Sequence, residues 1–262
     1  MTASQRKIIF TATFLLLFFL TSFGWAADIS ALVSKRVSQD GKTLDLSGLN
    51  IGASGAKQLA KMDLLAGITN LHLQGNNIRA RGMKALAKSP HLAGLKHIDL
   101  WGNLLGDLGL KAISESPYLK QLETLKLWKN EISDDSIELM VVSGNFTHLK
   151  TLMLNDNLIT PAGAAMLAST SLFPQLLTLN LFSNDIGDGG ALAFASSKNF
   201  SSLELLYLGE NKITDQGAVT LIESQYFPRL KVLDLAMNPL GEATMMAAFK
   251  VNNKGKLQIV YR

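Results

Sequence analysis

The chain has 262 residues, of which 47% are hydrophobic and 18% charged, and its formal net charge is +4. The lysines and arginines are scattered and form no basic run, so the composition gives no indication of nucleic-acid binding. The chain has no cysteine, which excludes disulfides, thiolate zinc sites and cysteine nucleophiles.

The first residues predict export. Arg6 and Lys7 precede an apolar stretch over residues 8–27, with small residues near its end. A basic segment, an apolar segment and small residues make a secretory signal peptide, which we predict over residues 1–26 with cleavage after Ala26. The alternative is an uncleaved membrane anchor over residues 8–27, since roughly 20 apolar residues span a bilayer. Both interpretations place the rest of the chain outside the cytoplasm, either periplasmic or secreted.

A repeated motif follows a short cap. Residues 27–42, with Leu32, Val33 and Val37, predict a helix-like N-terminal cap, and the repeats occupy residues 43–262. There the pattern Leu-x-Leu-x-x-Asn-x-Ile/Leu returns at a constant 27-residue period in eight units, the first of them degenerate. A fixed period of this length predicts an array in which each unit packs only on its neighbours.

Each unit is predicted to begin with a short strand. Its two leucines have the same parity, so both point to one face, and the asparagine closes the strand. The asparagine amide can donate to and accept from backbone groups of adjacent turns, which predicts a structural ladder. Leu49 replaces the asparagine in the first unit, which has no preceding turn to bond. The ladder consists of Asn76, Asn103, Asn130, Asn157, Asn184, Asn211 and Asn238.

A helix of two to three turns is predicted later in each unit, because two apolar columns lie three residues apart among many alanines. The first of these columns is Met83, Leu110, Ile137, Ala164, Ala191, Ala218 and Met245. Another column ends in four aromatic residues, which predict a buried spine between repeats. These are Phe146, Phe173, Phe200 and Phe227.

The C-terminal residues predict a ninth strand. Leu257 continues a leucine column at the period of the array, and residues 258–262 read as a strand. Lys254 stands where the aromatic spine would continue. A terminal strand has an unpaired edge, which predicts weak self-association at this end.

One strand and one helix per unit predict a right-handed α/β solenoid. From about Thr43 onward, the pattern resembles the ribonuclease-inhibitor type of leucine-rich repeat. The resemblance implies a horseshoe with a parallel sheet on its concave face and helices on its convex face. It does not select a partner, because that family includes inhibitors of secreted enzymes, Ran-type GTPase-activating proteins and sensor proteins.

The strand residues that alternate with the inward leucines, before, between and after them, are predicted to point onto the concave face. Trp101 and Trp128 fall in one such column on adjacent strands about 5 Å apart, so their indoles are expected to stack. Exposed aromatic residues are typical of binding hot spots, although a stacked ladder would also stiffen the sheet. The predicted partner-binding residues are Trp101, Trp128, Met153, Phe182, Tyr207, Asp99, Lys126, His72, Asn155 and Asn180.

Other chemistry is weakly indicated. His72, His97 and Asp99 have the residue types of a metal site, but their spacing gives no independent support, so we predict no metal and no cofactor. Asn145 and Asn199 match the glycosylation pattern, and each overlaps the phenylalanine column. No catalytic motif is found in the sequence, and the chain is predicted not to be an enzyme.

The sequence therefore predicts an exported, non-catalytic module that binds a protein through its concave face. A carbohydrate-binding surface is the alternative, because aromatic platforms also stack on sugar rings. A GTPase regulator of Ran type is disfavoured by export and by the lack of matching functional residues. Contact with a membrane is expected only through the N-terminal segment, if it is uncleaved.

Overall fold

Nine short strands of the described chain lie side by side in chain order and form one parallel sheet. The computed structural model describes residues 29–252, 255 and 257–262; the predicted signal peptide or anchor and Lys254 lie outside these residues. The strands are β1 (Thr43–Asp45), β2 (Asn70–His72), β3 (His97–Asp99), β4 (Thr124–Lys126), β5 (Thr151–Met153), β6 (Thr178–Asn180), β7 (Leu205–Tyr207), β8 (Val232–Asp234) and β9 (Gln258–Val260).

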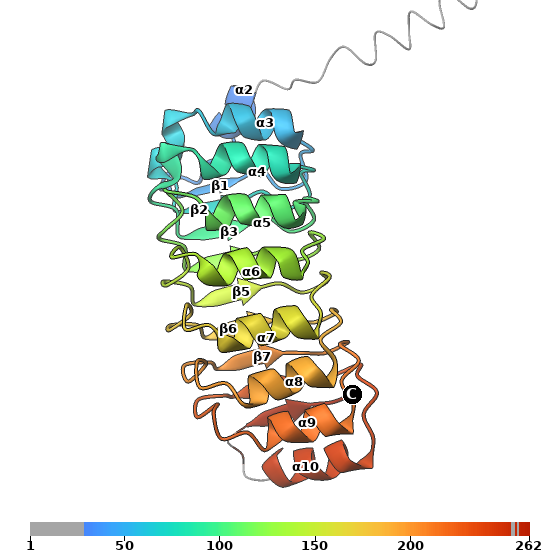
Figure 1. The fold of residues 1–262 in the computed structure, drawn as a ribbon. Coiled ribbons are helices and arrows are strands. Elements are labelled where there is room, and N and C mark those ends of the chain that lie inside the picture. Colours follow the sequence, from blue (N-terminus) through green and yellow to red (C-terminus); the bar gives the residue numbers. More distant parts are fainter. Residues whose placement is uncertain (1–28, 253–254, 256) are drawn as a thin grey trace, which may run out of the picture.

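Helices α3 to α10 are stacked in the same order as the strands (Figure 1). A short helix, α2 (Ile29–Ser34), precedes them, and two 3-10 turns, η1 (Asp63–Gly67) and η2 (Pro90–Leu92), lie in the early connections. The stacked helices are α3 (Gly52–Leu59), α4 (Arg79–Ala87), α5 (Gly106–Ser114), α6 (Asp134–Val142), α7 (Pro161–Ser169), α8 (Gly187–Ala195), α9 (Asp215–Ile222) and α10 (Glu242–Asn252). Within the residues described, no helix has both the length and the apolar character needed to cross a membrane.

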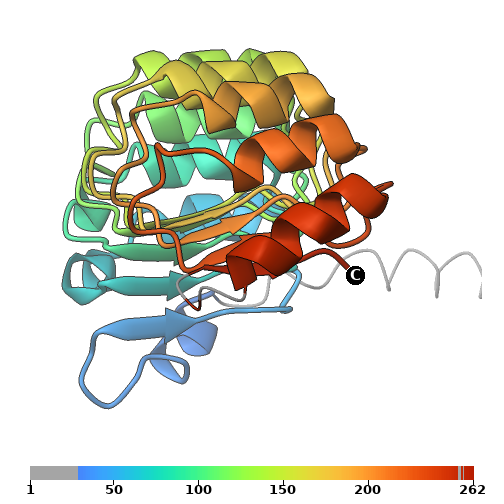
Figure 2. The ribbon, with the colours of Figure 1, turned by 90° about the horizontal axis from the view of Figure 1, so that it is seen from below.

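The array is a right-handed α/β solenoid with the strands on its inner side and the helices on its outer side (Figure 2). Neighbouring strands lie about 4.8 Å apart, whereas packed helices need about 8–10 Å, so the stack bends with its sheet on the concave face. The leucines of the repeated motif fill the space between the layers, and Leu125 and Leu127 are fully buried. Phe146, Phe173 and Phe200 are at most 2% exposed, which confirms the aromatic spine.

The asparagine ladder is confirmed by its hydrogen bonds. Asn103 donates its amide to the carbonyls of Leu73, in the preceding repeat, and Leu100, at 2.8 and 3.0 Å. Its Oδ1 accepts from the backbone N–H groups of Asn76 and Ile78, both in the preceding repeat, at 3.2 and 3.1 Å. Each asparagine thus bonds backward along the array, which explains why the first unit can carry Leu49 instead.

A second column, of hydroxyl side chains, joins the helix ends of successive repeats and was not predicted. Ser116 Oγ donates to the carbonyl of Ala87 at 2.5 Å, and Ser224 Oγ donates to Ala195 in the same way at 2.6 Å. In both pairs the acceptor belongs to the preceding repeat. The column consists of Ser89, Ser116, Ser143, Thr170, Ser197 and Ser224.

Ser143 is the exception within this column. The carbonyl that its hydroxyl would be expected to reach, that of Ser114, accepts instead from the Asn145 side-chain amide at 2.8 Å. The hydroxyl of Ser143 is buried and has no hydrogen-bond partner among the described residues. Asn145 is 7% exposed, and its amide also donates to the carbonyl of Ser116. The amide is therefore buried and hydrogen-bonded in the folded chain, where a glycan would not fit.

The C-terminal end departs from the period of the array in two places. Met245, the last member of an apolar helix column, is 36% exposed, because α10 is the last helix of the described chain and no later helix covers it there. Strands β1 to β8 pair at the period of the array, with Leu206 opposite Leu233, but β9 places Ile259 rather than Val260 opposite Leu233. A slip by one residue reverses the faces of a strand, so this register buries Ile259 and removes Leu257 from the expected column.

Candidate binding surface on the strand face

The residues between the paired leucines form a row across the concave face. In the register of the sheet, Asp99 lies beside Lys126, Lys126 beside Met153, Met153 beside Asn180 and Asn180 beside Tyr207. All five are partly exposed, whereas the leucines on either side of each are buried. The structure therefore gathers the predicted row on one face, with neighbours about 4.8 Å apart.

Trp101 and Trp128 stack beside this row, directly after strands β3 and β4. Their ring centroids lie 4.9 Å apart with an angle of 26° between the planes. They remain 40% and 41% exposed, so the pair is a partly solvated aromatic surface. The indole N–H of Trp128 donates to Asp156 Oδ2 at 3.2 Å, which fixes the ring orientation and satisfies its polar atom.

The carboxylate of Asp99 contacts both a backbone N–H group and a lysine side chain in this region. One oxygen accepts the backbone N–H of Trp101 at 3.2 Å, and the other lies 3.3 Å from Lys126 Nζ. The Asp99 side chain is only 14% exposed, whereas Lys126 is 42% exposed. The ion pair therefore leaves the Lys126 side chain partly exposed to solvent at the edge of the tryptophan pair.

Phe182 continues the tryptophan column two strands further on, but its ring is partly covered. Asn180 Oδ1 accepts the backbone N–H of Phe182 at 2.9 Å, as Asp99 does for Trp101. A Cβ on Gly209, in the next repeat, would lie 2.4 Å from Cε2 of Phe182. The ring therefore lies directly against the Gly209 backbone, and only a glycine permits this contact.

The remaining predicted residues lie on the same face without forming a reactive cluster. His72 and Asn155 are partly exposed, and His97 Nδ1 lies 2.9 Å from the hydroxyl of Thr124. Among the described residues, no group of three or more His, Asp, Glu or Cys side chains could hold a metal ion. Sequence reasoning missed Asp156 and Gly209, although Gly209 is the one glycine in the tryptophan column.

The comparisons with known proteins agree with this repeated architecture. A family model described as Leucine Rich repeat matches residues 68–87, 147–168, 174–195 and 201–221. No curated protein matches the chain.

Several solved structures resemble the fold. An internalin from Listeria monocytogenes is 20% identical with a TM-score of 0.48, and the match covers 78% of this chain and 65% of that one. A protein from Bacteroides fragilis is 15% identical with a TM-score of 0.48, covering 96% of this chain and 82% of that one. The plant peptide hormone receptor RGFR1, solved in complex with RGF2, is 15% identical with a TM-score of 0.32, covering 77% of this chain and 41% of that one.

This chain thus spans less than two thirds of the internalin and of the receptor. These likenesses concern the fold alone, and the ribonuclease-inhibitor type stays a prediction. The matched repeats, together with the strand and helix that recur in each unit, make this chain a leucine-rich repeat protein.

Proposed function

We propose that this chain is an exported, non-catalytic module that binds a protein partner through its concave strand face. The observation that carries the proposal is the stacked, 40% exposed pair of Trp101 and Trp128. Leucine-rich repeat proteins are commonly protein-interaction modules. Export rests on the predicted signal peptide, and an anchor over residues 8–27 would tether the same surface to a membrane.

The geometry around the tryptophans supports a partner with both apolar and polar groups. Tryptophan is enriched at binding hot spots, which are surrounded by polar residues that exclude water. Here the ion pair of Asp99 with Lys126 borders the two indoles, and Met153 lies in the next strand. The rings are already oriented by stacking and by Asp156, so binding would cost little side-chain entropy.

A carbohydrate partner is the second candidate, and the exposed indoles are the observation that favours it. However, one face of each indole is covered by the other ring, which leaves less aromatic surface for a sugar. Titration with cell-wall and host glycans, monitored by tryptophan fluorescence, separates the two candidates. A quench or shift that saturates would favour the glycan.

The test is a double substitution, Trp101→Ala with Trp128→Ala, followed by cross-linking and pull-down from the native extracytoplasmic milieu. The matched control replaces two exposed apolar residues of the convex face, Val142→Ala with Leu192→Ala. We expect the double tryptophan variant to lose its partner and the control to retain it. If the tryptophan variant folds, as judged by circular dichroism, and keeps every partner, the proposal is wrong.

A further inference from the structure

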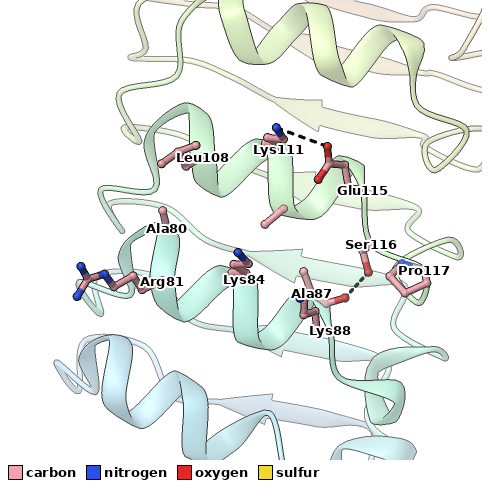
Figure 3. A pocket seen from close by; sticks show the side chains of 11 residues that line it. Ala80, Arg81, Lys84, Ala87, Lys88, Leu108, Lys111, Glu115, Ser116 and Pro117 are labelled. Atoms are coloured by element: carbon pink, nitrogen blue, oxygen red, sulfur yellow. Dashed lines mark hydrogen bonds and ion pairs between the residues drawn. The ribbon is translucent and has the colours of Figure 1, made fainter.

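A second surface, on the convex side, gathers cations that are scattered in the sequence. A cavity of about 400 Å³ lies between α4 and α5, and Arg81, Lys84 and Lys88 line it from α4 and its C-terminal end. Figure 3 shows these three along one helix and Leu108, Lys111 and Glu115 along the other. A neighbouring cavity of about 550 Å³ is lined by Lys57, Lys61 and Lys88. We call the two together the basic groove.

The repeat period explains why these cations meet. Lys57, Lys84 and Lys111 occupy the same position of three successive repeats. Lys61 and Lys88 repeat in the same way. Successive helices pack about 8–10 Å apart, so the column crosses three helices on one face. On α4, residues 81, 84 and 88 also share a face and extend over about 10 Å.

Most of these charges have no acidic partner. Within the described residues, no ion pair is found for Lys57, Lys61, Arg81, Lys84 or Lys88, whereas Lys111 lies 3.8 Å from Glu115. Two lysines elsewhere show closer pairing: Lys150 lies 2.7 Å from Glu123 and Lys231 2.6 Å from Glu204. The basic groove therefore presents a local excess of positive charge, which attracts anions and raises their association rate.

The lining of the groove between α4 and α5 selects among anions. Between the cations lie Ala80, Ala87, Ala112 and Pro117, and the nearby Leu108 side chain is 70% exposed. Of the residues that the structure describes, no Phe, Tyr or Trp lines either cavity, so nucleic-acid bases have no ring there on which to stack. The cations are mostly lysines on flexible stems, which pair with anionic groups as point charges. Carboxylates combined with apolar side chains fit both the charge and the apolar floor.

We propose that the basic groove binds an acidic segment of a protein that also carries apolar side chains. Its glutamates or aspartates pair with Arg81, Lys84 and Lys88, and its apolar side chains cover Leu108 and the alanines between the helices. This surface lies on the side of the molecule opposite the tryptophan pair. It is therefore a second binding site, independent of the function proposed for the concave face.

The experiment measures fluorescence anisotropy of labelled peptides added to the full-length protein. One probe is a short peptide of glutamates and leucines, and a second has the same charge with serines in place of the leucines. The groove variant carries Arg81→Gln, Lys84→Gln and Lys88→Gln. The control variant carries Lys120→Gln, Arg229→Gln and Lys250→Gln, which removes the same charge from exposed positions elsewhere.

We expect the glutamate–leucine peptide to bind more tightly than the serine peptide, and more weakly at high salt. The groove variant should lose about tenfold in affinity, as expected for three partly exposed ion pairs, and the control less than about threefold. Leu108→Gln should weaken binding of the leucine peptide alone.

Three results would overturn the proposal. The wild-type protein fails to bind the peptide, or the control variant loses as much affinity as the groove variant. The third such result is that the groove variant no longer binds inorganic polyphosphate or phosphatidylglycerol vesicles but binds the peptide as the wild type does. The double tryptophan variant should bind the peptides normally, so failure of either proposal can be recognised separately.

Discussion

The hydroxyl column that joins the helix ends predicts opposite effects for two chemically identical substitutions. Ser116 and Ser143 occupy the same position in successive repeats. Ser116 Oγ donates to Ala87 O at 2.5 Å and accepts from the backbone N–H of Leu119 at 3.1 Å. The hydroxyl of Ser143 is buried without a partner among the described residues, and the equivalent carbonyl, that of Ser114, accepts from the Asn145 amide.

The structure gives the sign and size of both effects. Ser116→Ala removes a hydroxyl with three hydrogen bonds and leaves buried backbone groups unpaired, which costs about 2–3 kcal/mol. Ser143→Ala removes an unpaired buried hydroxyl, so the free energy of unfolding should be unchanged or higher by up to about 1 kcal/mol. The two variants should therefore differ by about 2–4 kcal/mol.

Urea unfolding followed by far-ultraviolet circular dichroism measures both variants against the wild type. Repeat arrays can unfold in parts, so the comparison requires the same slope of free energy against urea in all three proteins. The reasoning is refuted if Ser143→Ala destabilises the protein as much as Ser116→Ala does. Replacing Asn145 with alanine as well tests whether its amide excludes Ser143 from the Ser114 carbonyl. Two repeats later the Ala168 carbonyl accepts from both Ser197 and Asn199, at 2.5 and 3.2 Å.

Two further predictions concern acid stability and the packing of the aromatic column. Hydrogen bonds from Lys150 and then Lys96 lower the pKa of Glu123 from 4.5 to about 2. Because this pKa is lowered on folding, the ionised Glu123 stabilises the folded state fully above pH 4.5, and the stabilisation is lost as the pH falls toward 2. Glu123→Gln should therefore reduce the fall in Tm between pH 4.5 and 2. An equally steep fall in the variant would contradict this. Gly209→Ala places a Cβ 2.4 Å from the Phe182 ring and should cost about 1–3 kcal/mol in urea unfolding. The penalty should be smaller in a Phe182→Ala background, and equal penalties would show that the ring is not the obstacle.

Much of the concave surface could be predicted from the sequence. Strict alternation along Leu-x-Leu-x places the side chains between and after the leucines outward, and a constant period places equal positions on neighbouring strands. These two rules predict that Trp101 and Trp128 stack, and their centroids lie 4.9 Å apart. The rules could not predict that Asp156 would hold the Trp128 indole, because Asp156 lies beyond the strand in the left-handed conformation, with φ of 57°, where the alternation of faces no longer applies.

The ends of the array depart from the period for a physical reason. An interior repeat is covered on both sides, so its columns have the same surroundings in every unit. The last repeat of the described chain has a neighbour on one side only, and there Met245 is exposed and β9 shifts its register by one residue to bury Ile259. Sequence columns assume equal surroundings, and that assumption fails where the stack stops.

The sequence by itself determined the repeat length, the inward leucines, the asparagine ladder and the face on which the tryptophans lie. Those features depend on period and parity, which are local properties of the chain. Only the tertiary structure decided the contacts that join different positions of the repeat, and the packing at the end of the stack. The indole of Trp128 reaches Asp156 of the next repeat, and β9 shifts its register by one residue to bury Ile259. The period places equal positions against each other, as it does Lys150 and Glu123, but side-chain orientation and the lack of a further neighbouring repeat in the described chain act only once the chain is folded.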